Sequence, residues 1–138
     1  MSDSQGLLVV EDDPDLSGLL QLVLADAGYS VRVAGNGAAA LALVAEEMPR
    51  LILLDMRMPV MNGWEFAREF RARHGRAARL VVVTAAENAR LRAQEIDADG
   101  WVEKPFDLDV VLDVVALQLA ARDSRAPPPG DAAPSEST

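Results

Sequence analysis

The sequence predicts an α/β fold in which a five-stranded parallel sheet carries helices on both faces. Short apolar runs recur along the chain, amphipathic stretches separate them, and prolines or glycines stand at many of the junctions. Strands of a parallel sheet are buried on both sides and are therefore apolar throughout, and each must return through a crossover such as a helix. This alternation favours a doubly wound sheet with right-handed crossovers.

The strands are predicted from runs of four or five residues that are apolar or β-branched. A run of this length, bounded by turn or polar residues, is typical of a buried strand. Residues 30–34, SVRVA, alternate between apolar and polar, which indicates a strand at the edge of the sheet. The predicted strands are residues 7–10, 30–34, 51–54, 80–83 and 100–103.

The first two helices are predicted from apolar residues spaced three and four apart, and from their end signals. Asp13 is a predicted N-cap with Pro14 at the first helical position, and Gly28 ends this helix. Asn36 is the predicted N-cap of a helix over 38–48, which Pro49 ends.

Three further helices complete the pattern. One is predicted over 63–74, and a polar, alanine-rich one over 87–95 has only Leu91 and Ile96 as apolar anchors. Phe106 and Asp107 form a predicted hydrophobic staple and N-cap for the last helix, which runs to about residue 122.

Composition is that of one globular domain, and the chain has 138 residues. We expect the domain to span 1–122 and the proline-rich segment 123–138 to be a disordered tail. The net charge of −9 argues against a general nucleic-acid surface. No run is long enough for a membrane span and no secretory signal is present, so a cytoplasmic protein is expected.

Acidic residues follow two of the predicted strands. In the flavodoxin-like strand order 2-1-3-4-5, the first and third strands are neighbours, and ligands bind at their carboxyl ends. Glu11, Asp12 and Asp55 then meet at one place. Three carboxylates so close repel one another strongly unless a proton or a cation is present. Oxygen ligands of this kind suit Mg²⁺, which we expect as the cofactor.

Two more side chains complete this rim. Thr84 follows the fourth strand, and Lys104 follows the fifth. Lys104 is the only lysine beside twelve arginines, and a lysine supplies a compact point charge where an arginine supplies a planar fork. Acids, a metal, a hydroxyl and an ammonium are the parts needed to place a phosphoryl group on Asp55.

Four motifs in this order, LLVVEDDP, LLDMRMPVMNG, VVVTA and WVEKPF, resemble a response-regulator receiver domain. The resemblance covers about residues 6–121 and is to a stand-alone, chemotaxis-regulator-like receiver. It implies that Asp55 is the phosphoacceptor and that Glu11, Asp12, Asp55 and the backbone carbonyl of Arg57 hold Mg²⁺. It also implies that Thr84 and Lys104 bind the phosphoryl group.

The resemblance implies further roles around this site. Thr84 and Trp101 would form the conformational switch, although Trp101 stands where the family usually has Tyr or Phe. The bond before Pro105 would be cis. Arg57 and Ala86, each two residues beyond a site residue, would tune the lifetime of the phosphorylated state.

The resemblance also implies partners. The phosphodonor would be a histidine kinase or a histidine phosphotransfer protein, and the chain would have no enzymatic activity beyond its own phosphoryl acceptance and loss. We expect an unidentified output protein, no direct DNA binding and no membrane contact. The residues do not decide between a monomer and a homodimer. Two alternatives remain: a phosphorylation-independent scaffold, and a Mg²⁺-dependent phosphatase of the haloacid dehalogenase type. The latter needs an Asp where the chain has Arg57.

Overall fold

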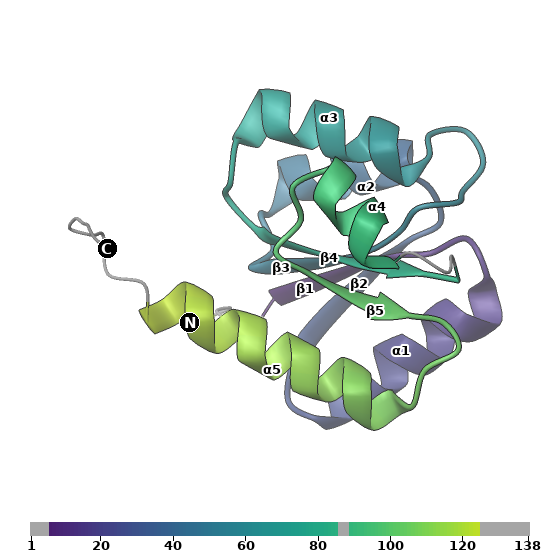
Figure 1. The fold of residues 1–138 in the computed structure, drawn as a ribbon, viewed down its shortest axis with the longest axis vertical. Helices are drawn as coiled ribbons and strands as arrows, with labels where there is room; N and C mark the ends of the chain where they lie inside the picture. Colours follow the sequence, from purple (N-terminus) through teal and green to yellow (C-terminus); the bar gives the residue numbers. More distant parts are fainter. Residues whose placement is uncertain (1–5, 86–88, 125–138) are drawn as a thin grey trace.

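The computed structural model describes residues 6–85 and 89–124 and contains the predicted doubly wound sheet. All neighbouring strands pair in parallel, and their order is β2-β1-β3-β4-β5, which confirms the predicted fold class (Figure 1). The strands are β1 (Gly6–Val10), β2 (Ser30–Ala34), β3 (Leu51–Asp55), β4 (Arg79–Thr84) and β5 (Gly100–Glu103).

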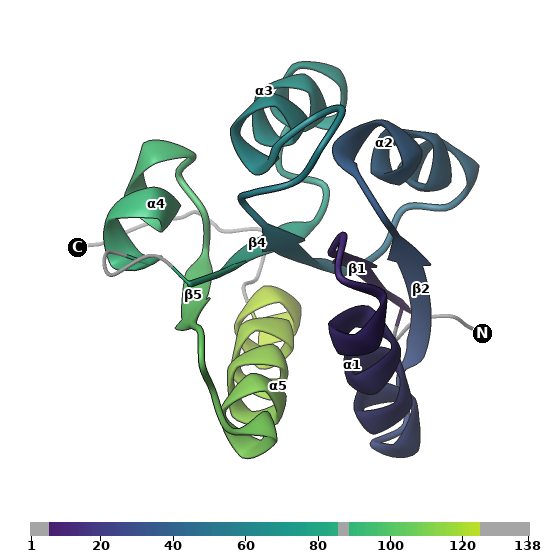
Figure 2. The ribbon, with the colours of Figure 1, turned by 90° about the vertical axis from the view of Figure 1, so that its right-hand side faces the viewer.

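Helices cover both faces of the sheet (Figure 2). One face carries α1 (Pro14–Asp26) and α5 (Leu108–Ser124), and the other carries α2 (Gly37–Glu46), α3 (Gly63–His74) and α4 (Ala89–Glu95). Successive side chains of a strand point to opposite faces. The buried residues therefore separate into two cores, one containing Leu8, Ile52 and Phe66, the other Leu7, Leu53 and Val115.

Side-chain caps fix where the first two helices begin. Asp13 Oδ1 accepts the amide of Asp15 at 3.0 Å, and Asn36 Oδ1 accepts the amide of Ala39 at 2.9 Å, so both predicted N-caps are confirmed. These caps hold the starts of α1 and α2 beside the carboxyl ends of β1 and β2.

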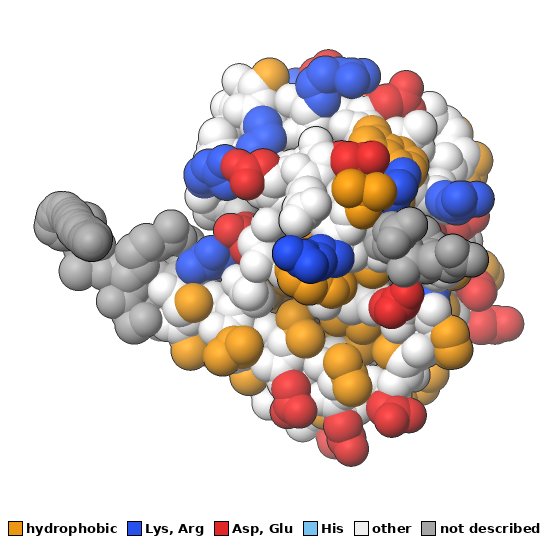
Figure 3. All heavy atoms as spheres, viewed as in Figure 1, with side chains coloured by type: hydrophobic (Ala, Val, Ile, Leu, Met, Phe, Trp, Pro, Cys, Tyr) orange, Lys and Arg blue, Asp and Glu red, His pale blue; other side chains and the backbone are white. Residues whose placement is uncertain are grey.

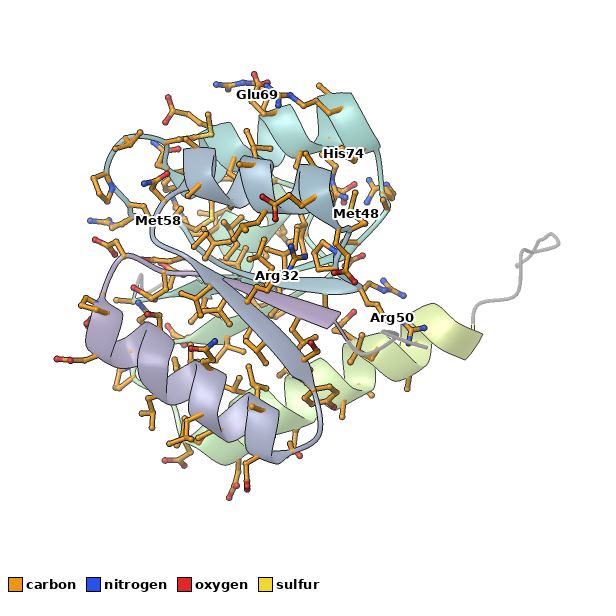
Figure 4. The ribbon with its side chains drawn as sticks, turned by 180° about the vertical axis from the view of Figure 1, so that it is seen from behind. Arg32, Met48, Arg50, Met58, Glu69 and His74 are labelled. Carbon is orange, nitrogen blue, oxygen red and sulfur yellow. The ribbon has the colours of Figure 1, made fainter. Side chains whose placement is uncertain are left out.

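The second helix ends at Glu46, two residues before the predicted end at Met48. Proline disfavours helical geometry in the residue before it, so Pro49 holds Met48 out of the helix. Arg32 of β2 donates to the carbonyl oxygens of Leu43 at 2.8 Å and Glu47 at 2.5 Å, and it thereby caps the C-terminal end of α2 (Figure 4).

The fourth helix ends where it was predicted to end, and the fifth is longer than predicted. Within the described residues α4 spans Ala89–Glu95, and its predicted start at residue 87 lies outside them. Its anchors are Ala89 and Ala93, whereas Leu91 is 42% exposed and Ile96 packs only partly buried. α5 continues to Ser124, past the predicted domain boundary at 122, and the rest of the predicted tail lies outside the described residues. Among the helices described, none combines the length and apolar character needed to cross a membrane.

Candidate functional site

The carboxyl ends of β1 and β3 bring Glu11, Asp12 and Asp55 together. One carboxylate oxygen from each lies within 4.8 Å of the others. Glu11 and Asp55 are buried, and Asp12 is exposed. The β3–α3 loop that carries Met58 lies at this end of the sheet, opposite to Met48 and Arg50 (Figure 4). An all-oxygen donor set with one open side suits a hard divalent cation that keeps several water ligands.

Lys104 supplies the positive charge of the site. Its Nζ lies 3.0 Å from Glu11 Oε1 and 3.9 Å from Asp55 Oδ1. The backbone amide of Lys104 donates to the carbonyl of Thr84 at 2.8 Å, which joins the ends of β4 and β5, and the Lys104–Pro105 peptide bond is cis. The side chain of Thr84 is buried at the end of β4.

Two backbone amides hold the buried acids in place. The amide of Arg57 donates to Asp55 Oδ1 at 3.2 Å, and the amide of Asp13 donates to Glu11 Oε2, also at 3.2 Å. Sequence reasoning missed both contacts, because every residue except proline has an amide and nothing in the sequence marks these two. The sequence predicted other roles for these two residues. Asp13 was expected as a helix cap, and the backbone carbonyl of Arg57 was expected to bind the metal. The role of the Arg57 carbonyl stays a prediction.

The electrostatics of the site centre on Asp55. Its burial, followed by the charge of Glu11, raises the pKa of Asp55 from 3.8 to about 7. The Arg57 amide and the ammonium of Lys104 act in the opposite direction but do not offset the burial. Without a cation, Asp55 therefore carries a proton for much of the time at neutral pH.

The loop after β3 is shaped by short-range contacts. The amide of Met61 donates to the carbonyl of Pro59 at 2.7 Å, which closes a γ-turn around Val60. Val60 has a φ of 70° and is 82% exposed. The amide of Gly37 donates to the carbonyl of Met61 at 3.0 Å, so this loop is tied to the start of α2.

Three further residues were predicted to act at this site: Trp101, Arg57 and Ala86. Trp101 lies on the edge strand β5 and is 45% exposed, and the side chain of Arg57 is exposed. Ala86 lies outside the described residues. An apolar pocket of about 490 Å³ includes Lys104 in its lining, together with Leu16 and Leu19 of α1 and with Phe106.

Comparison with known families identifies one match. The model of the response regulator receiver domain matches residues 7–116. Among curated relatives, the DNA-binding response regulator MtrA of Mycolicibacterium smegmatis is 40% identical over 104 residues, which is 74% of this chain and 45% of MtrA. The transcriptional regulatory protein YxdJ of Bacillus subtilis is 32% identical over 82% of this chain and 49% of its own length. The chain thus spans about half the length of the curated relatives it matches.

Solved structures agree with this match. The response regulator TrrA of Thermotoga maritima, in complex with Mg²⁺ and BeF, is 32% identical with a TM-score of 0.74, covering 83% of this chain and 98% of TrrA. A CheY-like receiver domain protein of Methanospirillum hungatei has a TM-score of 0.82 at 21% identity, covering 90% of this chain and all of its own, and shows the shared fold.

These relatives contradict one expectation. We expected output through an unidentified protein without direct DNA binding. Relatives such as MtrA are named as DNA-binding response regulators, and the chain matches only about half of their length. The expectation of output without direct DNA binding was therefore wrong, whereas the expected histidine kinase is not affected by this finding.

Proposed function

Because the chain belongs to the response regulator receiver domain family, we propose that Asp55 is the residue that accepts a phosphoryl group. The observation that carries the proposal is the meeting of Glu11, Asp12 and Asp55 at the ends of β1 and β3, with Lys104 Nζ 3.0 Å from Glu11 and 3.9 Å from Asp55. The family match supports a two-component role, in which the phosphodonor is the phosphohistidine of a kinase.

The proposed step forms one bond and breaks one. A carboxylate oxygen of Asp55 attacks phosphorus, the N–P bond of the phosphohistidine breaks, and the leaving imidazole nitrogen takes up a proton. The attack needs the ionised form of Asp55, which its raised pKa makes only partly populated at neutral pH. Lys104 and the Arg57 amide favour that form, because both place positive charge or a donor next to Asp55 Oδ1.

We assign the cation to Mg²⁺, held by Glu11, Asp12 and Asp55 with the predicted help of the Arg57 carbonyl. The donor set fits this ion, because carboxylate and carbonyl oxygens are the ligands it prefers. When bound, Mg²⁺ supplies charge neutralisation for the transferring phosphoryl group.

The residues around Asp55 receive roles from their positions. Thr84 at the end of β4 and Lys104 at the end of β5 are proposed to bind the phosphoryl oxygens, and Trp101 to change its exposure with Thr84. The exposed Arg57 is proposed to shield the acyl phosphate from water, and Ala86 to tune the same lifetime. The apolar pocket beside Lys104 gives the phosphohistidine-bearing partner a surface to contact.

Intact mass after incubation with acetyl phosphate tests the proposal. We expect a Mg²⁺-dependent gain of one phosphoryl group that Asp55→Ala abolishes. Asp113→Ala, the same change at an exposed position of α5, is the matched control and should still gain it. A chain that gains nothing, or that gains a phosphoryl group in the Asp55→Ala variant, would contradict the assignment, and the first outcome would favour the scaffold alternative.

A further inference from the structure

Positive charge is concentrated on one part of this acidic chain. The net charge is −9, yet seven of the thirteen basic residues lie between Arg68 and Arg92. Three of these arginines lie on α3 and two on α4. One lies in the segment between α3 and β4, and one is the first residue of β4. Figure 3 shows basic side chains, with acidic ones among them, around the part of the surface where α3 and α4 lie, and hydrophobic and acidic ones over the α5 part. The receiver site uses none of these seven arginines.

A groove of about 470 Å³ separates α3 from the end of α4. Ala67, Trp64 and Ile96 supply its apolar wall, and Arg68, Arg71 and Arg76 supply its charge. Trp64 is held in place by α4, because its indole Nε1–H donates to Glu95 Oε1 at 2.8 Å and the Arg92 guanidinium lies 5.9 Å from its ring centroid.

The two acids of the groove are already paired. Asp97 pairs with Arg76, and Glu95 accepts from Trp64 and pairs with Arg92 at 3.4 Å. Arg71 donates to backbone carbonyl oxygens, those of Gly75 at 3.3 Å and Asp97 at 2.8 Å. Burial, followed by the charge of Arg76, lowers the pKa of Arg71, while Asp99 and Asp97 act in the opposite direction.

Arg68 leaves its donors available. It is exposed on α3, and across residues 6–85 and 89–121 it makes no hydrogen bond or ion pair. A guanidinium offers a planar fork that matches a carboxylate in bidentate geometry. The groove therefore combines the exposed guanidinium of Arg68 with an aromatic and aliphatic wall.

We propose that this groove docks an acidic segment of a partner protein, one that carries an apolar side chain among its carboxylates. The apolar side chain would lie against Trp64 and Ile96 while a neighbouring carboxylate pairs with Arg68. We take the acidic groups to be carboxylates, because one carboxylate matches the exposed guanidinium of Arg68 in bidentate geometry. The surface is separate from the carboxylate cluster, and docking there does not require Asp55.

Nuclear magnetic resonance of the ¹⁵N-labelled full chain tests the proposal. The probe is the peptide Ac-Glu-Glu-Leu-Glu-Glu-NH₂, and the reporter is the indole N–H signal of Trp64. Trp101, the only other tryptophan, lies outside the groove and serves as internal reference. We expect the peptide to shift the Trp64 signal with saturation, and Ac-Glu-Glu-Ser-Glu-Glu-NH₂ to bind more weakly because it lacks the apolar side chain.

Two charge reversals on the same helix separate docking from general attraction. Arg68→Glu should weaken peptide binding at least about fivefold, because one contact is lost and a repulsion replaces it. Arg73→Glu is the matched control, since Arg73 is exposed on α3 but does not line the groove. Equal weakening by both variants, equal binding of the serine peptide, or an unmoved Trp64 signal at millimolar peptide would overturn the proposal.

Discussion

Lys104 pairs more closely with Glu11 than with Asp55. Its Nζ is 3.0 Å from Glu11 Oε1, whereas the distance to Asp55 Oδ1 is 3.9 Å. Glu11 comes from the end of β1 and Lys104 from the end of β5, so this ion pair spans the carboxyl ends of the strands. A phosphoryl group on Asp55 would offer Lys104 a stronger partner, because it carries more charge than a carboxylate.

Replacement of Lys104 should destabilise the fold at neutral pH. Lys104→Gln leaves the buried Glu11 without its cation, and we expect a loss of about 1 kcal/mol in the free energy of unfolding. We expect the loss to be small for two reasons. The Lys104 side chain is 21% exposed. In addition, Asp55 can take up a proton when Lys104 no longer balances the negative charge of the two acids. Urea unfolding at pH 7.5 measures the change.

The exposed Arg90 of α4 provides the control for this measurement, since Arg90→Gln removes a cation of the surface and should change stability by less than about 0.5 kcal/mol. The effect of Lys104→Gln should also shrink as the pH falls and the acids become protonated. An effect equal to that of Arg90→Gln would show that the Lys104–Glu11 pair does not stabilise the fold.

Much of this site could be predicted because it depends on topology. Parallel strands in the order 2-1-3-4-5 place the residues after β1 and β3 side by side, so Glu11, Asp12 and Asp55 were predicted to meet from their sequence positions alone. Which carboxylate Lys104 approaches depends on side-chain rotamers and on the amides of Asp13 and Arg57. Neither has a signal in the residue pattern.

Stability should fall with rising pH because of Asp55. The raised pKa means that the folded state holds a proton that the unfolded state releases between pH 3.8 and about 7. This group therefore destabilises the fold progressively across that range, and fully above it. A rise from 3.8 to about 7 sets an upper limit of about 4 kcal/mol.

Asp55→Asn removes this pH dependence, because the amide cannot ionise. We expect the variant to be more stable than the parent by about 2 kcal/mol at pH 8 and similar to it near pH 4. Thermal unfolding followed by circular dichroism over this pH range measures the difference. Asp113→Asn, at an exposed position of α5, should show no such trend. A gain that is the same at both pH values would refute the buried-charge explanation.

Divalent cations should stabilise the chain through the same acids. Binding to the folded state alone contributes about 1.4 kcal/mol at ten times the dissociation constant. We expect Mg²⁺ to raise the melting temperature, and Asp12→Asn to weaken that rise, because Asp12 supplies one of the three ligand oxygens. Asp109→Asn, an exposed acid on α5, is the control. An equal response of the Asp12 and Asp109 variants would place the ion elsewhere.

Contacts between helices were less accessible to sequence reasoning than the strand order. The indole of Trp64 on α3 donates to Glu95, 31 residues away, and no spacing in the sequence links these two residues. The anchors of α4 were expected to be Leu91 and Ile96, whereas the buried ones are two alanines. Small residues let a helix approach a sheet closely, and a pattern of large apolar residues does not reveal this contact.

The left-handed backbone of Val60 should be a site of local strain. A β-branched residue with a φ of 70° meets a steric penalty of about 1–2 kcal/mol, and Val60 is 82% exposed, so its side chain gains little from packing. Glycine has no Cβ and adopts positive φ without this penalty, so Val60→Gly should stabilise the fold by about 0.5 kcal/mol after the greater freedom of glycine in the unfolded chain is subtracted. Val60→Ile keeps the β-branch and should leave the stability near that of the parent. The free energy of unfolding in urea measures both variants. A glycine variant no more stable than the isoleucine variant would show that the γ-turn after Pro59 carries no strain.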